Sequence, residues 1–512
     1  MRAPLDLTGL LDAALAEAAD RVVLVDAGRS LTGAQVRRRV DEIASWLRER
    51  GAGPGRVVAA CQGNHTEAVV LFLAAQRAGA VWAGINPGLG AKEKARLVAG
   101  LDPAVLVADE PAETLLGGAP PDGCHLTGEA GSGSGPVERA AADPTAPAAI
   151  AFTSGTTSAP KGVVHSGHNL ALAALGVAGR RTRPDGPLGS CLPVMVLNIM
   201  LLGPVAALLS GRRSVLIPKP SGQVVARWVA EHRVAELGVP PTVIHDLLDT
   251  CESPRETLRS LVWLESGGAA CTQRLAERYE AATGNRIVRS YGLTEAPGTV
   301  CAPDSPSAQV PGASGRPLEH LRLVIRDSSG APVPAGTSGE ICLGARDDGP
   351  FAGLYRPMLG YWRSEREAPV VAGELRTGDL GVLDEDGNVR VLGRDSELII
   401  RGGANIAPQE VETALTAHPL VAQASVFGIP DERLGQVVAA AVEVPGPVPT
   451  VEELRAHVAA ELAWGKAPRY VLAVRTLPRN AAGKIQKAPL REAVEAVLRA
   501  GGHPRHLLID RT

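Results

Sequence analysis

Residues 148–162 read AAIAFTSGTTSAPKG, an apolar strand-like run followed by a loop of small and hydroxyl-bearing residues. With a helix expected from about His168, the stretch predicts a strand–loop–helix unit. Small residues let backbone N–H groups approach phosphate oxygens, hydroxyls add donors, and Lys161 adds a cation. The loop is not a Walker A loop, because Pro160 and Gly162 replace residues that this motif requires. Taken alone, the stretch is also compatible with a flexible Gly/Ser/Thr connection.

Strand and helix patterns alternate on both sides of this loop. Apolar strand-like runs are expected at 56–61, 80–85, 104–108, 148–152, 214–217, 261–265 and 287–290, and helical spacing of apolar residues at 65–78 and 91–99. Such alternation predicts an α/β fold, in which packed helices cover parallel-rich sheets. The Gly/Ser/Pro-rich residues 111–147 lack periodicity and predict a surface connection.

The texture changes from Arg322, where short β-like segments with turn signals such as Asp386-Gly387 predict a β-rich subdomain. Beyond it, a helix at 411–417, a strand at 422–428 and an amphipathic helix at 451–462 predict a small α+β domain. We place the boundary between a large N-terminal domain and this C-terminal domain near residues 394–397.

Composition narrows the class of protein. The 512 residues include 52 basic and 55 acidic side chains, a net charge of -3 that does not favour a nucleic-acid binder. Seven scattered cysteines, with no C-x-x-C pair, fit neither a disulfide framework nor a zinc site and favour a cytoplasmic protein. The apolar stretch 188–211 is interrupted by proline, glycine and asparagine, so we expect a buried core or pocket wall and no membrane span.

Further short motifs follow the loop in a fixed order. They are Ser266-Gly267-Gly268-Ala269, Tyr291-Gly292-Leu293-Thr294-Glu295, Thr377-Gly378-Asp379, Gly393-Arg394, Gly402-Gly403-Ala404-Asn405-Ile406 and Gly483-Lys484. Together with residues 153–162 they closely resemble the motifs of the adenylate-forming superfamily, which contains acyl-CoA synthetases, peptide-synthetase adenylation domains and firefly-type luciferases. The resemblance extends along nearly the whole chain.

The resemblance implies an AMP-forming acid–thiol ligase. Such an enzyme uses ATP and Mg²⁺ to activate a carboxylic acid as its acyl-AMP, releases pyrophosphate, and passes the acyl group to coenzyme A. It implies an AMP-binding domain at 1–394, a hinge at 395–396 and a mobile domain at 397–512 that carries the catalytic lysine. Ser396 occupies the pivot position, where the family usually has Asp or Lys, and this departure leaves the behaviour of the hinge open.

The resemblance also assigns roles to individual residues. Tyr291 offers a flat ring for adenine, Asp379 can accept hydrogen bonds from the ribose hydroxyls, and Arg394 can assist it. The residues implied to bind ATP or AMP are Thr153, Ser154, Gly155, Thr156, Thr157, Lys161, Gly267, Gly268, Ala269, Tyr291, Gly292, Asp379 and Arg394. The residues implied in catalysis are Thr294, Glu295, which is also the Mg²⁺ ligand, and Lys484. Without the resemblance, a core tyrosine, a loop ion pair and a solvated basic loop would explain the same positions.

The expected acyl pocket is lined by Val194, Met195, Val196, Asn198 and Met200. Residues 192–204 contain no Arg or Lys for a second carboxylate and no Asp for an α-amino group, so the sequence predicts an uncharged, hydrophobic acid. Gly402, Gly403 and Ala404 resemble the lining of a pantetheine tunnel. Arg433, Lys466 and Arg469 could contact CoA phosphates, although scattered surface cations are commonly only solvated.

Three other functions remain open at this stage. The chain could load the phosphopantetheine of a separate carrier protein, oxygenate the adenylate as luciferases do, or bind nucleotide without catalysis. The joint presence of Lys161, Glu295, Asp379, Arg394 and Lys484 disfavours the last of these. The oligomeric state, monomer or dimer, stays open.

Overall fold

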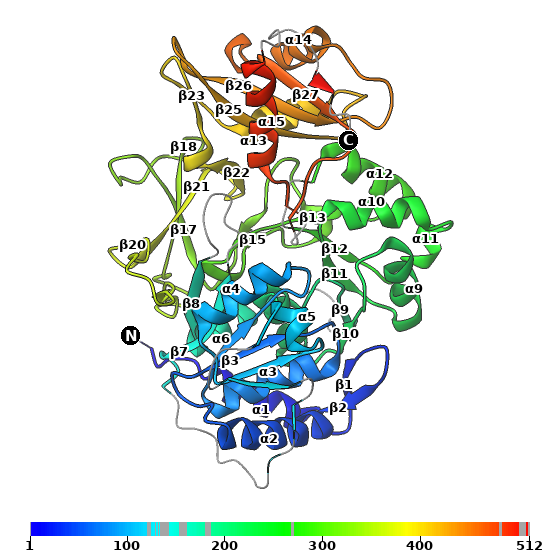
Figure 1. The fold of residues 1–512 in the computed structure, drawn as a ribbon, viewed down its shortest axis with the longest axis vertical. Helices are drawn as coiled ribbons and strands as arrows, with labels where there is room; N and C mark the ends of the chain where they lie inside the picture. Colours follow the sequence, from blue (N-terminus) through cyan, green and yellow to red (C-terminus); the bar gives the residue numbers. More distant parts are fainter. Residues whose placement is uncertain are drawn as a thin grey trace.

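The computed structural model describes residues 2–119, 124–127, 130–131, 133, 143–152, 161–179, 186–267, 271–480, 484–500 and 508–509. Figure 1 shows a large lower part built from the blue to yellow portion of the chain, with the C-terminal residues, orange to red, packed above it. The predicted mixed α/β architecture, with a large N-terminal domain and a small C-terminal domain, is confirmed.

The first seven-stranded sheet contains the predicted phosphate-binding unit. Its strand order is β19-β8-β7-β4-β3-β5-β6, and β3, β4, β5 and β7 run parallel. The strands are β3 (Val57–Cys61), β4 (Val81–Gly84), β5 (Val105–Ala108), β6 (His125–Thr127), β7 (Pro147–Phe152), β8 (Gly162–Ser166) and β19 (Gly360–Tyr361), and the helices that accompany them are α3 (Thr66–Ala78), α4 (Ala91–Leu101) and α6 (Gly167–Ala178). The expected alternation of strands and helices is therefore confirmed. Most of these elements begin and end within two residues of the predicted positions.

The second seven-stranded sheet has the order β13-β12-β11-β9-β10-β1-β2. Its strands are β1 (Val22–Val25), β2 (Ser30–Thr32), β9 (Leu188–Ser190), β10 (Ser214–Leu216), β11 (Glu236–Val239), β12 (Trp263–Ser266) and β13 (Ile287–Arg289), and its helices are α9 (Gly222–His232), α10 (Pro241–Thr250), α11 (Pro254–Thr257) and α12 (Gln273–Thr283). Leu237, Leu264 and Ile287 form one core with the apolar faces of α9, α10 and α12. The neighbouring β12 residues Trp263 and Glu265 therefore face the other side of the sheet.

The apolar stretch 188–211 forms β9 and then a broken helix. The helix consists of α7 (Leu197–Met200), a π-helical turn (Leu201–Val205) that contains Pro204, and α8 (Ala206–Leu209). Proline has no N–H to donate, which is why the regular helical hydrogen bonding is interrupted there. In the described part of the chain no helix is long and apolar enough to cross a membrane. Most side chains of the stretch 188–211 are buried, as the sequence predicted.

Smaller sheets complete the N-terminal domain. β14 (Tyr291–Leu293), β15 (Ala296–Ala302) and β16 (Arg316–Pro317) form one of them, and β17 (Arg322–Arg326), β18 (Ser338–Gly344), β20 (Val370–Val371), β21 (Glu374–Leu383) and β22 (Val389–Arg394) form the other. The predicted β-rich texture after Arg322 is thereby confirmed. Because β21 and β22 are paired, Asp379 lies opposite Arg394 in the register.

The C-terminal domain has its own sheet and core. Its strands are β23 (Ile399–Arg401), β24 (Ala404–Ile406), β25 (Gln423–Asp431), β26 (Gly435–Glu443), β27 (Tyr470–Val474) and β28 (Leu508–Ile509), and its helices are α13 (Pro408–Thr416), α14 (Val451–Glu461) and α15 (Lys487–Arg499). Val411, Val438 and Leu454 are fully or almost fully buried in one cluster. A short 3-10 turn, Asp395–Glu397, joins this domain to β22.

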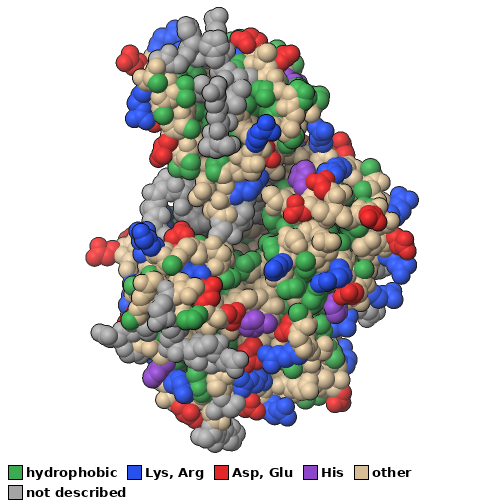
Figure 2. Space-filling view, turned by 45° about the vertical axis from the view of Figure 1, so that its right-hand side comes forward, with side chains coloured by type: hydrophobic (Ala, Val, Ile, Leu, Met, Phe, Trp, Pro, Cys, Tyr) green, Lys and Arg blue, Asp and Glu red, His purple; other side chains and the backbone are tan. Residues whose placement is uncertain are grey.

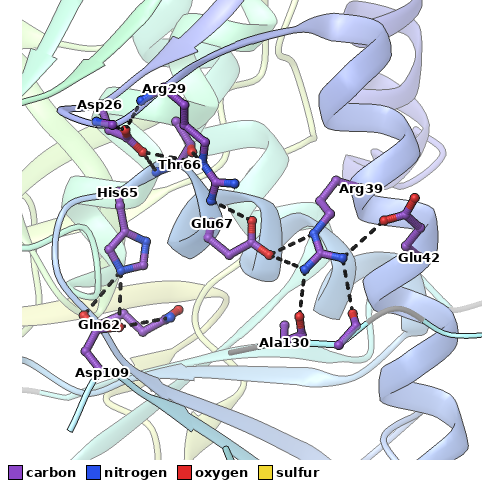
Figure 3. Close-up of polar contacts among 12 residues, drawn as sticks. Asp26, Arg29, Arg39, Glu42, Gln62, His65, Thr66, Glu67, Asp109 and Ala130 are labelled. Atoms are coloured by element: carbon purple, nitrogen blue, oxygen red, sulfur yellow. Dashed lines mark hydrogen bonds and ion pairs between the residues drawn. The ribbon is translucent and has the colours of Figure 1, made fainter. Parts of the chain in front are cut away.

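A polar network, drawn in Figure 3, joins the helix α2 (Gly33–Glu49) and the turn that holds Asp26 to α3, beside the first sheet. The Asp26 carboxylate accepts from the Thr66 backbone N–H at 2.7 Å, at the start of α3. Arg39 on α2 pairs with Glu67 on α3 at 2.7 Å. These contacts set the position of the loop that leaves β3.

The predicted surface connection 111–147 includes secondary structure that its sequence did not indicate. It contains the short helix α5 (Ala112–Leu116) and the strand β6, which pairs with β5 and extends the first sheet. Both elements are too short to show a periodic pattern in the sequence. The Gly/Ser-rich run 128–136 lies largely outside the described residues. On the face shown in Figure 2, basic and acidic side chains are interspersed, as the near-neutral net charge suggests.

Arg212 and Glu236 form an ion pair inside the second sheet, with 3.0 Å between Nη1 and the carboxylate and side chains 1% and 4% exposed. Arg212→Leu is expected to lower the free energy of unfolding by about 3–5 kcal/mol, because the Glu236 charge would stay buried without its partner. The double variant Arg212→Leu/Glu236→Leu should recover most of this loss. Denaturant unfolding of the three proteins provides the measurement, and a double variant no better than the single one would contradict this account.

Candidate active site

Tyr291, Asp379 and Arg394, which the sequence placed in separate motifs, meet at one point. The Tyr291 hydroxyl donates to Asp379 Oδ2 at 2.6 Å, and Arg394 Nε lies 3.0 Å from Asp379 Oδ1. Burial raises the pKa of the Asp379 carboxyl, and the Arg394 guanidinium and the Tyr291 hydroxyl partly offset this effect. Burial and the neighbouring carboxylate also raise the pKa of Tyr291, which therefore remains a donor.

The turn that carries Asp379 is held by a residue that the sequence analysis missed. Glu340 on β18 accepts the Gly378 backbone N–H at 3.0 Å and pairs with Arg376. Gly378 has φ +70°, a left-handed conformation that favours glycine. The Thr377 hydroxyl donates to the Ile341 carbonyl at 2.7 Å. The backbone around Asp379 is therefore fixed by the Glu340 side chain and the Ile341 carbonyl of the adjacent strand, and no motif in the sequence identified Glu340.

Lys484, from the C-terminal domain, lies beside the same cluster. Burial and the positive charge of Arg394 lower the pKa of the Lys484 ammonium, while Asp379 and Glu295 act in the opposite direction. The side chain keeps solvent access although protein surrounds it. Two hydrogen bonds join Lys484 to Asn480: the Lys484 N–H donates to Asn480 Oδ1, and the Lys484 carbonyl accepts from the Asn480 N–H.

Thr294 and Glu295 form the turn between β14 and β15. The buried His165 on β8 lies behind them, with Nε2 2.8 Å from the Thr294 carbonyl oxygen. Burial lowers the pKa of His165 to about 4, so the ring is neutral at pH 7 and Nε2 carries the proton that it donates. His165 thus positions the turn from below, and no spacing in the sequence indicated this role.

A magnesium site at Glu295 fits this arrangement. In the described residues no group of three or more His, Cys, Asp or Glu side chains is placed to hold a metal ion. Mg²⁺ in nucleotide enzymes is commonly held by one or two carboxylates and by the substrate phosphates, so the single half-buried carboxylate of Glu295 is sufficient. When bound, the ion would neutralise phosphate charge.

The phosphate loop itself lies mostly outside the described residues. The predicted site residues that lie outside the described part of the chain are Thr153, Ser154, Gly155, Thr156, Thr157, Gly268 and Ala269. Lys161 immediately precedes β8 and is half-buried, and the Gly267 N–H donates to the Val239 carbonyl at 3.1 Å. Gly292 is exposed, and a Cβ there would lie 2.7 Å from the Gly298 carbonyl oxygen.

The expected acyl-pocket residues divide into two groups. Val194, Met195 and Met200 are fully buried in the large core beneath the first sheet. Val196 is 37% exposed, and Asn198 is half-buried and accepts the Gly298 N–H of β15 at 3.1 Å. Only the second group is placed to meet a substrate directly.

The predicted tunnel residues form the hairpin between β23 and β24. Gly402 and Gly403 have φ values of +58° and +84°, as a two-residue hairpin turn requires, and Ala404 is exposed beside them. Of the cations suggested for CoA phosphates, Lys466 pairs with Glu410 and Arg469 with Asp431. Arg433 is exposed. The first two would have to exchange these partners to bind phosphate.

Ser396 lies exposed in the 3-10 turn between the domains. On one side Arg394 is tied to Asp379, and on the other Glu397 pairs with Lys487 of α15 at 2.6 Å. The predicted hinge 395–396 therefore falls between a residue anchored in the first domain and one anchored in the second. A further contact crosses between the domains where Arg274 Nη1 on α12 donates to the Pro419 carbonyl at 2.6 Å.

Comparison with known proteins agrees with this site. Residues 11–362 match the family of AMP-binding enzymes, and residues 410–484 match the AMP-binding enzyme C-terminal domain. The chain is 31% identical to a 4-chlorobenzoate–CoA ligase of Arthrobacter sp., covering 93% of this chain and 92% of the relative. It is 32% identical to a 2-succinylbenzoate–CoA ligase of Bacillus cereus, over 93% and 96% of the two chains.

The solved structures give the same answer. The amide bond synthetase from Marinactinospora thermotolerans superposes with a TM-score of 0.84 at 32% identity, covering 95% of this chain and 99% of the synthetase. The family match spans well over half of the chain. The chain thus belongs to the AMP-binding enzyme family, as its motifs indicated, and is an AMP-forming acid ligase of the adenylate-forming superfamily.

Proposed function

We propose that this chain activates a hydrophobic carboxylic acid as its acyl-AMP and transfers the acyl group to the thiol of coenzyme A. The observation that carries the proposal is the position of Lys484, a cation of the C-terminal domain that lies close enough to Asp379, Arg394 and Glu295 for their charges to act on it. A cation at this point can neutralise charge where the substrate carboxylate and the α-phosphate meet. The similarity to the 4-chlorobenzoate–CoA and 2-succinylbenzoate–CoA ligases supports CoA as the acceptor.

The chemistry proceeds in two steps. In the first, a carboxylate oxygen bonds to the α-phosphorus of ATP while the bond to the bridging oxygen breaks and pyrophosphate leaves. In the second, the CoA sulfur bonds to the acyl carbon, AMP leaves, and the thiol proton is lost to solvent. In both steps the protein mainly holds the reacting groups in line and supplies charge. Tyr291 would face adenine, Asp379 the ribose and Thr294 the α-phosphate.

The domain boundaries follow from the same proposal. Residues 1–394 would bind the nucleotide, 395–396 would act as the hinge, and 397–512 would bring Lys484 to the site for adenylation only. The hairpin Gly402–Ala404 would then face the site for thiol transfer, after the domain has turned.

The test is an ATP–pyrophosphate exchange assay with a panel of carboxylic acids, followed by product analysis. We expect Mg²⁺-dependent exchange and the release of AMP and pyrophosphate. ADP as the stoichiometric product would contradict the mechanism.

The acceptor is tested separately, with CoA, a phosphopantetheinylated carrier protein or an amine added to the acyl-AMP. A second candidate acceptor, an amine, is favoured by the similarity to the amide bond synthetase. Amide formation with no thioester would replace CoA in the proposal while leaving adenylation intact.

Asp379→Ala should weaken ATP binding by about 1–3 kcal/mol, because the ribose would lose a charged acceptor and the Tyr291 hydroxyl its partner. Calorimetric titration with ATP measures this change. Asp386→Ala, which removes an exposed carboxylate in the turn between β21 and β22, is the matched control and should bind ATP like the wild type. If a folded Asp379→Ala protein binds ATP as tightly as the wild type, Asp379 does not contact the ribose and is only a turn residue.

A further inference from the structure

A small cavity with one carboxylate lies on the inner side of β12. Glu265 and Trp263 of β12, Thr299 of β15 and Val177 of α6 line it, together with Ala302, Pro303 and Leu318. Apart from Thr299 the rest of its lining is mainly apolar, and Val177, Trp263 and Leu318 are almost fully buried. A carboxylate is costly to place among such side chains unless it has a binding partner.

The contacts of Glu265 leave part of this carboxylate available. The Ser290 hydroxyl donates to Oε1 at 2.5 Å, and the Trp263 indole N–H lies 3.4 Å from Oε2, a long contact. Both partners are neutral, and a carboxylate can accept about four hydrogen bonds. Oε2 in particular has acceptor capacity toward the cavity.

The cavity adjoins the place where the acid substrate is expected. Val177, Ala302 and Leu318 pack against Ala206 and Ala207, on the helical segment that continues from Val196 and Asn198. Thr299 follows Gly298, whose N–H is held by Asn198. On the opposite side, Ser290 directly precedes Tyr291, and Glu265 lies two residues before Gly267. The cavity therefore borders the helical segment that continues from the proposed acyl wall, and the strand β12 that lines it leads to the proposed nucleotide motif at Gly267.

The size of the cavity restricts what it can hold. Its volume is about 20 Å³, whereas a water molecule needs roughly 10–15 Å³ on the same measure. It can accept one hydroxyl or amino group but not the body of an acid. The apolar body would lie toward Val196, with its polar substituent directed at Glu265.

We propose that Glu265 is a specificity-determining residue, which selects a hydrophobic acid carrying one hydrogen-bond donor, a hydroxyl or an amino group, at a distance from its reactive carboxylate. This inference rests on the proposed acid activation and narrows its substrate class. Glu265 is half-buried within this mainly apolar lining, so an analogue that leaves the carboxylate without a donor there is penalised. The donor thus contributes to selection against plain hydrocarbon acids.

The experiment compares acids that differ only in the donor. One set is octanoate, 8-hydroxyoctanoate and 8-aminooctanoate, and the other is 3-phenylpropanoate with its 4-hydroxy and 4-aminomethyl derivatives. Exchange rates give kcat/KM for each acid, and calorimetry gives its affinity. The wild type should favour a donor-bearing acid over its parent by about tenfold or more in at least one set.

Two substitutions of Glu265 then identify the group responsible. Glu265→Leu should reduce the preference for the donor to about onefold or reverse it, without loss of ATP binding. Glu265→Gln keeps a neutral acceptor, so it should retain a preference for hydroxyl but lose one for a cationic amine. Glu277→Leu, the same change at an exposed position on α12, is the control and should leave all ratios unchanged.

The outcomes separate this inference from the proposed function. Exchange with the parent acids as fast as with the donor-bearing acids, unaltered in Glu265→Leu, would overturn the inference and leave acid activation standing. Binding without any exchange would contradict acid activation, and the affinity ratios would then decide the role of Glu265. Absence of both binding and exchange across the two sets would contradict both.

Discussion

Lys484→Ala is expected to slow acyl-AMP formation on the order of 10²- to 10³-fold while leaving thioester formation from synthetic acyl-AMP and CoA near the wild-type rate. The ammonium lies beside Asp379, Arg394 and Glu295 in the described arrangement of the domains. Its charge would be used mainly in the transition state, where negative charge of the carboxylate and the α-phosphate come together. ATP affinity should therefore change much less than the rate.

The two half-reactions are measured separately, by pyrophosphate exchange and by thioester formation from the preformed adenylate. Arg491→Ala removes an exposed cation from α15 of the same domain and should affect neither. Equal damage to both half-reactions in a folded Lys484→Ala protein would contradict the division of roles. Lys484 would then be a general nucleotide-binding or structural residue.

The sequence predicted the elements of the fold well because the sheets are buried on both sides. Runs such as 57–61 are wholly apolar, and the helices between them show clear periodicity, so strands and helices could be separated by pattern alone. What could not be predicted is which strands share a sheet. Strand order depends on long-range packing, and β1 pairs with β10, nearly two hundred residues away, without any local signal.

The residues of the candidate site also form two groups, those that the sequence identified and those that it did not. Residues in short motifs, such as Tyr291, Asp379 and Lys484, could be named from the sequence, and the structure brings them together. Residues that act through others could not be named: Glu340 fixes the turn of Asp379, and His165 supports Thr294. Their roles depend on which side chains tertiary packing brings into contact.

The expected acyl wall shows the limit of reasoning from one segment. The apolar run at 194–200 predicted a pocket lined by residues of one short segment, whereas Val194 and Met195, before α7, and Met200, at its end, are buried in the core. Glu265, more than sixty residues later, belongs to no motif that the sequence reveals. An acid pocket formed by three separate elements leaves no continuous pattern in the sequence.

Two proline substitutions in the hinge should have opposite effects. In the turn Asp395–Glu397 the preceding residue Arg394 is extended, with φ -88° and ψ 139°, which is the conformation that a following proline requires. Asp395→Pro therefore fits the described arrangement and should hold it in place. Pyrophosphate exchange should persist, while thioester formation should fall on the order of 100-fold because the thiol site is not assembled.

Ser396→Pro should destabilise the same turn, because a proline at 396 disfavours the helical conformation that Asp395 adopts there. It should therefore slow exchange more than thioester formation, the reverse of Asp395→Pro, and Ser396→Ala should leave both rates unchanged. The comparison uses the same two assays on the four proteins, with ATP affinity and thermal unfolding as checks on folding. If both proline variants slow the two half-reactions in equal proportion, the turn is a structural joint and the domain does not pivot there. If the two proline variants instead slow opposite half-reactions, the backbone conformation of Asp395 and Ser396 controls the change from adenylation to thiol transfer. The exposed side chains of these two residues would then contribute little.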